Sequence, residues 1–292
     1  MTDPVEGHHE AVALGIRLQG LPLDPWPPSA VPVSSCQSLE WRATRKPVPG
    51  DPDGWSSGQS AGAIIGWGGF AEYQVLAGAS PAVDVLIDDI SGTDAVLAFL
   101  LSVLPMALPL FGLEPFHGSA VRVDDGAAVF LGGRGGGKSS TAAALHSIGY
   151  PVLTDDACAM DADGVLWPGP PFVSPRDDRA EQRVVGRYNK KFLRSIGDTN
   201  GGPANVEQVF LLQPHPGTDL SVRRLSAAEA FPAVIAQSRH PFFLAEVRCD
   251  LQFRLAARLS GLGVSAIEYD PDRCSFLDVA TEVTSSIRLG AA

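Results

Sequence analysis

A glycine-rich loop at residues 132–139 carries the most specific chemical signal in the chain. It reads Gly-Gly-Arg-Gly-Gly-Gly-Lys-Ser, follows the apolar residues 128–131 and precedes a predicted helix over residues 138–148. This is a complete G-x-x-x-x-G-K-[ST] phosphate-binding loop in the strand–loop–helix context that it requires. The loop amides and the positive end of the helix dipole would face phosphate oxygens. A glycine-rich turn that binds nothing is the alternative, and the complete match argues against it.

The loop supplies the predicted nucleotide-binding residues. Lys138 can reach the β- and γ-phosphates of ATP, and the Ser139 hydroxyl can bind Mg²⁺. We therefore predict ATP and Mg²⁺ as the bound species. The predicted nucleotide-binding set is Gly132, Gly133, Arg134, Gly135, Gly136, Gly137, Lys138, Ser139 and Ser140.

Two adjacent carboxylates, Asp155 and Asp156, follow a short predicted strand at residues 152–154, one helix after the loop. One carboxylate could bind Mg²⁺, directly or through water, and the other could accept the proton of an attacking hydroxyl. Crowding of their like charges would raise the pKa of one of them. A surface turn is the alternative, because Asp favours turns. Their position after the phosphate loop favours the functional interpretation.

His117 opens the predicted strand over residues 116–123, which turns at residues 124–126 into the strand of the phosphate loop. Because neighbouring strands of a hairpin pair, we expect His117 to lie near the loop, where it can meet phosphate or metal. A structural histidine held by a backbone carbonyl is the alternative.

The most basic part of the chain, residues 176–194, could place cations on a triphosphate or on an anionic substrate. Lys190 and Lys191 are the candidates there, and a solvated helix face is the alternative. Arg239, which follows a predicted helix, is a further candidate cation of the site. Residues 197–204 are predicted to be a flexible loop that could act as a lid.

Composition limits the class of protein. The chain has 292 residues, 45% of them hydrophobic, so it can bury a sizeable core. A net charge of −11 argues against a nucleic acid or an anionic membrane as partner. The four cysteines show no C-x-x-C spacing and the N-terminus lacks the pattern of a signal peptide, so we expect a cytoplasmic protein with reduced thiols.

The pattern along the chain predicts two parts. Residues 1–92 are expected to form a β-rich N-terminal region, with strands at residues 11–18, 63–67, 70–76 and 82–87 and a long loop over residues 25–62. Residues 93–292 are expected to form the ATP-binding catalytic domain. Its first segment, residues 95–113, is uncharged and long enough to span a membrane, but Pro105 and Pro109 interrupt it. We favour a buried helix over residues 93–104 followed by a second, broken segment.

The remaining pattern alternates strands and helices. A second hairpin is predicted over residues 157–167, a strand over 206–212 and another over 264–269. Helices are predicted to begin at the Ser226–Glu229 capping box, at about residue 243 and at about residue 276. No internal repeat is present.

His117-Gly-Ser-Ala, the loop and Leu153-Thr-Asp155-Asp156 resemble, in order and spacing, the catalytic domain of HPr kinase/phosphorylase. The chain is most similar to a variant group of HPr-kinase-like proteins with a short β-rich N-terminal region. The resemblance implies an α/β (α+β) fold with a phosphoenolpyruvate-carboxykinase-like core of mixed sheet and helices. It also implies catalytic roles for Lys138, for Asp155 as general base and for His117 beside the phosphates, with Mg²⁺ near Ser139 and Asp156.

The chain departs from that family at Ser140, where an acidic residue is usual, and it lacks the later glycine-rich segment that engages the HPr partner. The leading hypothesis is a kinase acting on a Ser or Thr hydroxyl of a peptide or protein. The alternatives are a small-molecule hydroxyl kinase, a non-catalytic ATP-sensing module and an ATP hydrolase. The sequence leaves open the acceptor, a reverse phosphorylase reaction and assembly into a homo-oligomer.

Overall fold

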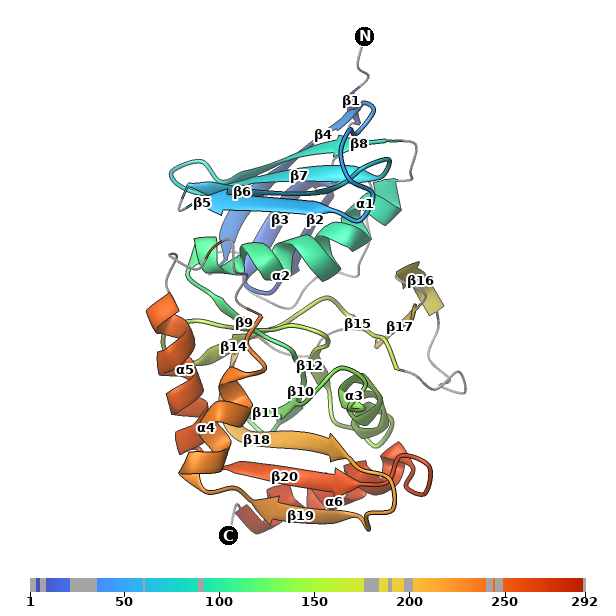
Figure 1. Ribbon diagram of the computed structural model, residues 1–292, viewed down its shortest axis with the longest axis vertical. Coiled ribbons are helices and arrows are strands. Elements are labelled where there is room, and N and C mark those ends of the chain that lie inside the picture. The colour runs from blue at the N-terminus through green and yellow to red at the C-terminus, as the bar shows by residue number, and fades with distance from the viewer. Residues whose placement is uncertain are drawn as a thin grey trace.

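The computed structural model describes residues 4–5, 9–21, 36–59, 61–88, 92–175, 184–188, 191–196, 202–239, 244 and 249–290. It shows a mixed α/β protein with several sheets of mixed strand direction and few helices, which agrees with the predicted α+β class. One sheet is built from the N-terminal part of the chain and a second from the part that holds the phosphate loop. A helical run lies between them (Figure 1).

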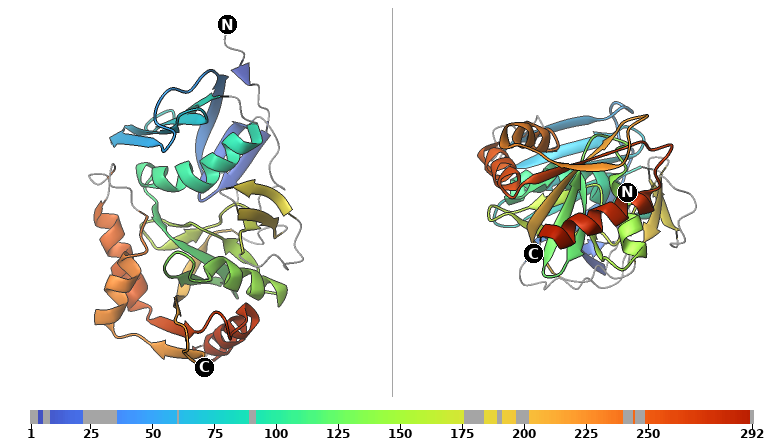
Figure 2. Two further views of the ribbon diagram at one scale, coloured as in Figure 1. Left: turned by 45° about the vertical axis from the view of Figure 1, so that its right-hand side comes forward. Right: turned by 90° about the horizontal axis from the view of Figure 1, so that it is seen from below.

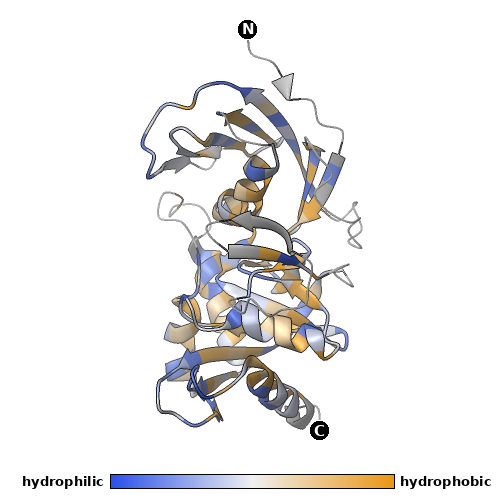
Figure 3. Ribbon diagram, turned by 90° about the vertical axis from the view of Figure 1, so that its right-hand side faces the viewer, coloured by the Kyte–Doolittle hydropathy of each residue, from blue (hydrophilic) through white to orange (hydrophobic). Residues whose placement is uncertain are grey.

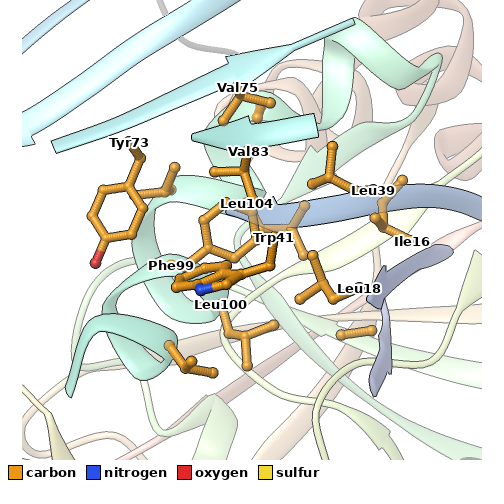
Figure 4. Close-up of a cluster of buried hydrophobic side chains, with 14 of the residues drawn as sticks. Ile16, Leu18, Leu39, Trp41, Tyr73, Val75, Val83, Phe99, Leu100 and Leu104 are labelled. Carbon is orange, nitrogen blue, oxygen red and sulfur yellow. The ribbon is translucent and has the colours of Figure 1, made fainter. Parts of the chain in front are cut away.

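The N-terminal sheet has eight strands in the order β2-β3-β4-β8-β7-β6-β5, with β1 paired to β4. Their bounds are β1 Pro4–Val5, β2 His9–Ala13, β3 Ile16–Leu21, β4 Gln37–Arg45, β5 Trp55–Gln59, β6 Gly62–Trp67, β7 Ala71–Leu76 and β8 Ala82–Ile87. Alternate residues of the central strands point to one core, shown in Figure 4. Trp41 packs there edge-on against Phe99 of the helical run, with ring centroids 5.5 Å apart.

The helical run extends without a break from residue 92 to residue 111. It comprises α1 Gly92–Ala98, a π-helical turn Phe99–Val103, α2 Leu104–Ala107 and a 3-10 turn Leu108–Phe111. The predicted break does not occur, because Pro105 lies in the first turn of α2, where a missing N–H is tolerated. Figure 3 shows the run as mostly apolar.

Residues 93–111 are apolar and long enough to cross a membrane, yet 72% of the most apolar window is buried inside the protein. The run packs on the N-terminal sheet, so the expectation of a helix buried under a sheet is confirmed. The core of the run is shared with the N-terminal sheet. The division of the chain at residue 92 stays a prediction.

The second sheet has nine strands in the order β12-β10-β11-β18-β14-β13-β9, and β20 pairs with both β18 and β19. Their bounds are β9 Glu114–Phe116, β10 Gly118–Val123, β11 Gly126–Leu131, β12 Val152–Thr154, β13 Cys158–Met160, β14 Val165–Trp167, β18 Ala204–Pro214, β19 Ser221–Arg224 and β20 Val264–Tyr269. A small third sheet contains β15 Phe172–Val173, β16 Val184–Tyr188 and β17 Lys191–Ser195.

Helices cover both faces of the second sheet. Helices α3 Lys138–Ser147 and α6 Phe276–Gly290 pack on one face, and α4 Ala227–Ile235 and α5 Cys249–Gly261 on the other (Figure 2). Strand β11 is therefore buried at every position: Ala127, Val129 and Leu131 face α4 and α5, whereas Ala128 and Phe130 face α3 and α6. This explains why the strand reads as a continuous apolar run instead of an alternating one.

Strand directions bring the chemical residues to one edge of this sheet. Strand β10 is antiparallel to both β11 and β12, so β11 and β12 run in the same direction. The carboxyl ends of β11 and β12, where the phosphate loop and the aspartate pair begin, therefore lie at the same edge as the amino end of β10. That end carries His117, as the predicted hairpin required.

Several predicted elements differ from the structure. The predicted loop over residues 25–62 contains β4 and β5, although residues 22–35 lie outside the described part. Strand β4 has the two-residue alternation of buried Leu39, Trp41 and Ala43, which the surrounding Pro, Ser and Gly residues obscured. The single strand predicted over residues 11–18 is a hairpin, because Leu14 and Gly15 both adopt positive φ.

The strand predicted over residues 116–123 is divided at His117. The His117 amide donates to the carbonyl of Gln237, 2.6 Å away, instead of to a strand of the sheet. The capping box of Ser226 and Glu229 opens α4 as predicted. Helix α5 is described from Cys249, and residues 245–248 before it lie outside the described part, so its predicted start near residue 243 stays a prediction. Strand β19 was not predicted.

Candidate functional site

The phosphate loop, residues 132–137, leaves β11 and enters α3 with three glycines in left-handed or extended positive-φ conformations. At Gly132, φ is 145° and an added Cβ would lie 2.6 Å from the carbonyl oxygen of Leu212. At Gly137, φ is 80°. Only glycine adopts these conformations without strain, so the motif glycines are explained by the backbone path.

Lys138 is folded over its own loop. Its ammonium group donates to the carbonyl oxygens of Gly132, at 2.7 Å, and Gly133, at 2.9 Å. The side chain is buried, whereas Gly133 and Arg134 are exposed. A positive charge beside the backbone amides of this loop is suited to bind an anion.

Asp155 is buried beneath the loop and accepts hydrogen bonds on both carboxylate oxygens. The Ser119 hydroxyl donates to Oδ1 at 2.5 Å, and the Ser174 amide donates to Oδ2 at 2.9 Å. Ser139, the last residue of the motif, is near enough for its side chain to lower the pKa of this carboxylate. Burial raises the pKa of Asp155, and the nearby charge of Asp156 raises it further, against the opposing effect of these hydrogen bonds.

Asp156 is more exposed than Asp155 and has different partners. Its backbone adopts a positive φ of 68°, which is unusual for a residue other than glycine. The Arg239 guanidinium binds its carboxylate with both terminal nitrogens, at 3.0 and 3.2 Å. The side chain of Asp156 is 26% exposed, whereas Asp155 is only 6% exposed.

His117 completes the cluster. Its Nδ1 lies 3.2 Å from the carbonyl oxygen of Asp156, so in this hydrogen bond Nδ1 carries the proton and Nε2 keeps its lone pair. Burial lowers the pKa of His117 to about 4, and the positive charges of Arg239 and Lys138 contribute to the shift. The imidazole is therefore neutral at physiological pH.

This shift can be measured directly. We expect the ring of His117 to titrate with a pKa of about 4 instead of the ordinary 6.5. NMR of the histidine rings between about pH 3 and pH 8 would follow it, and loss of one resonance in His117→Gln would assign it. A ring that titrates at or above 6.5 would show that it is not buried beside these two cations in solution.

The predicted site residues are thus largely brought together. His117, Lys138, Ser139, Asp155 and Asp156 meet at one edge of the sheet, and Arg239 joins them although it lies 83 residues after Asp156 in the chain. Of the two predicted lysines, Lys190 lies outside the described residues. Lys191 begins β17, but its side chain is outside the described part. The predicted lid is described only from residue 202 onwards.

Two residues of the site were not predicted. Ser119 and Ser174 hold the Asp155 carboxylate from β10 and from the segment after β15. Ser119 could have been found, because it lies two residues after His117 on the strand beside the loop. Ser174 follows a proline-rich segment, and no sequence pattern links it to Asp155.

The oxygen donors of the site fit a magnesium ion bound mainly by substrate phosphates. Ser139 and Asp155 contribute a hydroxyl and a carboxylate that lie close enough for Ser139 to affect the pKa of Asp155. A site with few protein ligands is usual for Mg²⁺ that is bound together with a nucleotide. In the described part of the chain, no group of three or more His, Cys, Asp and Glu side chains is arranged to hold a metal by itself.

No family model matches the chain. One curated protein and one solved structure illustrate what it is similar to. The chain is 28% identical over 195 residues to the probable acrylyl-CoA reductase AcuI of Escherichia coli (strain K12). That match covers 67% of this chain and 54% of the reductase, so the chain spans about half the length of this relative. The structure of the Hpr(Ser) kinase/phosphatase from Coxiella burnetii is similar with a TM-score of 0.32 and 14% identity. It covers 61% of this chain and 97% of that one.

Proposed function

We propose that this protein is an ATP-dependent kinase of the HPr-kinase-like group, which transfers the γ-phosphoryl group to a hydroxyl. A Ser or Thr of a peptide or protein is the preferred acceptor, and a small-molecule hydroxyl is the alternative. The observation that carries the proposal is the meeting of a complete phosphate loop with Asp155, Asp156 and Arg239 at one edge of a sheet.

The loop and the amino end of α3 would bind the triphosphate. Main-chain amides and the helix dipole both favour negative charge there. Lys138 would exchange its bonds to the carbonyls of Gly132 and Gly133 for bonds to phosphate oxygens. Because phosphoryl transfer develops charge on those oxygens, a cation at this position lowers the barrier.

Mg²⁺, when bound, would neutralise phosphate charge. Ser139 and Asp155 would hold it, because the serine that ends the loop motif lies near this buried carboxylate. The Ser119 hydroxyl and the Ser174 amide would then orient the Asp155 carboxylate by donating hydrogen bonds to it.

The resemblance implies that Asp155 is the general base and that Asp156 lies near Mg²⁺. The surroundings of the two aspartates support the opposite assignment. A general base needs an oxygen that can reach the acceptor hydroxyl. Both carboxylates accept two hydrogen bonds, but Asp155 is buried, whereas Asp156 is partly exposed and is oriented by the guanidinium of Arg239. We therefore assign the proton acceptor to Asp156 and the metal-side carboxylate to Asp155.

Arg239 and His117 would complete the transfer site. The guanidinium of Arg239 has a planar array of donors suited to an anionic oxygen, so it can stabilise charge during transfer as well as orient Asp156. Neutral His117 supports the Asp156 backbone through Nδ1 without adding a further positive charge.

A hydride-transfer function has less support from the residues. The dinucleotide fingerprint G-x-G-x-x-[GA] requires a glycine or alanine at its last position. Starting at Gly133, that position is Lys138, and starting at Gly135 it is Ser140. The loop matches the triphosphate motif and not the dinucleotide motif.

The proposal is tested by binding and transfer with the wild-type protein. We expect calorimetric binding of MgATP, and transfer of labelled γ-phosphate to at least one member of a panel of Ser/Thr peptides and small alcohols. A panel that includes peptides encoded beside this gene would be the most informative. Binding without transfer to any acceptor would favour an ATP-sensing module, and absence of binding would refute both functions.

A further inference from the structure

Tyr269, the last residue of β20, reaches the phosphate loop from another part of the chain. It is 1% exposed, and its hydroxyl donates a hydrogen bond to the carbonyl oxygen of Gly136 at 3.2 Å. Its ring packs edge-on against Phe276, the first residue of α6, with centroids 6.3 Å apart. A buried phenol therefore contacts the backbone of the loop 133 residues away in sequence.

Strand pairing holds Tyr269 in this place. Strand β18 lies between β11 and β20 and is parallel to both, so all three strands end at the same edge. The carbonyl of Tyr269 accepts from the His215 amide at 2.8 Å. Immediately afterwards, the Asp270 carboxylate accepts from the amides of Gly217 and Asp272, at 2.7 and 2.9 Å. The backbone around Tyr269 is thus fixed on both sides.

The loop needs such a partner. Amides can point into a phosphate cradle only if the neighbouring carbonyls point out of it, and a carbonyl turned into the protein must find a donor. The Gly133 carbonyl accepts from Lys138 and from the Gly136 amide. For the Gly136 carbonyl, the Tyr269 hydroxyl is that donor.

The adjacent glycine shows how closely the aromatic pair fits. A Cβ added to Gly137 would lie 2.4 Å from the Tyr269 hydroxyl oxygen and 2.5 Å from a ring carbon of Phe276. Gly137 also has a φ of 80°. The two rings therefore fill the space beside the turn from which α3 begins.

We propose that Tyr269 is a positioning residue of the phosphate loop, whose hydroxyl fixes the Gly136 peptide so that the following amides face the triphosphate. This inference rests on the proposed function, because it assigns Tyr269 a role in nucleotide binding. Tyr269 does not touch the nucleotide in this role and acts only through the loop.

The test compares two single-atom changes. Tyr269→Phe removes the hydroxyl and keeps the ring against Phe276. Tyr73→Phe is the matched control, because Tyr73 is also fully buried and donates to a backbone carbonyl, that of Ala95, at 2.8 Å. Tyr73 lies in the N-terminal core (Figure 4), outside the candidate site.

We expect Tyr269→Phe to weaken MgATP binding about five- to tenfold, as for loss of one hydrogen bond, with Tyr73→Phe unchanged. Hydrogen exchange of the amides at residues 135–138, measured without nucleotide, should be faster in Tyr269→Phe alone. Thermal unfolding of both variants would separate a change in overall stability from a change in the loop.

Unchanged affinity and unchanged exchange in Tyr269→Phe would overturn the inference while leaving the kinase proposal intact. Equal losses of affinity in both variants would also overturn it, because the effect would then follow general stability. Absence of MgATP binding by the wild-type protein would overturn the proposed function and this role of Tyr269 together.

Discussion

Lys138→Ala is expected to lower the rate of phosphoryl transfer by about a thousandfold or more, and to weaken MgATP binding. The ammonium group occupies the fixed lysine position of the loop motif, and the transferred phosphoryl group develops negative charge that such cations stabilise. The measurement is the turnover of wild type and variant with the acceptor identified for the wild-type protein, together with calorimetric titration of MgATP.

Lys46→Ala is the matched control, because Lys46 is exposed and lies in the N-terminal region. Lys138 also bonds to two carbonyls of its own loop, so circular dichroism and thermal unfolding must show that the variant is folded. A folded Lys138→Ala protein with the turnover of the wild type would remove the phosphate loop from the mechanism.

The phosphate loop and its flanking elements could be predicted because their signals are local. Residues 126–131, 138–147 and 152–154 form the expected strand, helix and strand, and each is specified by apolar runs and glycines a few positions apart. The hairpin then determines that His117 meets the loop, since pairing of β10 with β11 follows from a short turn.

The contact between Arg239 and Asp156 could not be predicted from the local sequence. It reaches Asp156 because Ser238 forms a bridge with Phe116, and the Arg239 amide donates to the Pro115 carbonyl at 2.7 Å. These contacts join segments more than a hundred residues apart, and nothing in their composition marks the pairing. From the sequence, Arg239 could be predicted only as a candidate cation that follows a helix.

The predicted break in the helical run was wrong for a different reason. Pro105 and Pro109 predicted a break, because proline in a helix interior removes a hydrogen bond. The structure instead inserts a π-helical turn before Pro105 and a 3-10 turn around Pro109, so the axis continues with altered spacing. Burial between two sheets stabilises this irregular helix, and burial of that kind is a tertiary effect.

The roles of the aspartates depended on their partners and exposure, which adjacent positions do not reveal. Asp155 and Asp156 are both plausible bases by type. Their partners and their exposure distinguish them: buried Asp155 accepts from a serine hydroxyl and a backbone amide, whereas partly exposed Asp156 accepts from an arginine. Asp156 also adopts a positive φ of 68°, which its sequence position did not reveal.

Asp156→Asn is therefore expected to lower turnover by about a hundredfold to ten-thousandfold, the usual contribution of a general base, with little change in the affinity for MgATP. Asparagine keeps the shape of the side chain but cannot accept the proton of the acceptor. Asp155→Asn is expected to act differently: it should weaken MgATP binding, because the carboxylate beside Ser139 is lost.

Together, the two variants test which aspartate accepts the proton and which one lies beside the metal. Turnover and MgATP affinity should be measured for both, with Asp163→Asn as control, since Asp163 is exposed in the turn of the next hairpin. If Asp155→Asn abolished turnover at unchanged affinity and Asp156→Asn affected only binding, the proton would go to Asp155 as the family resemblance implies. Full turnover in both variants would show that neither carboxylate accepts the proton, and the kinase mechanism would need another base.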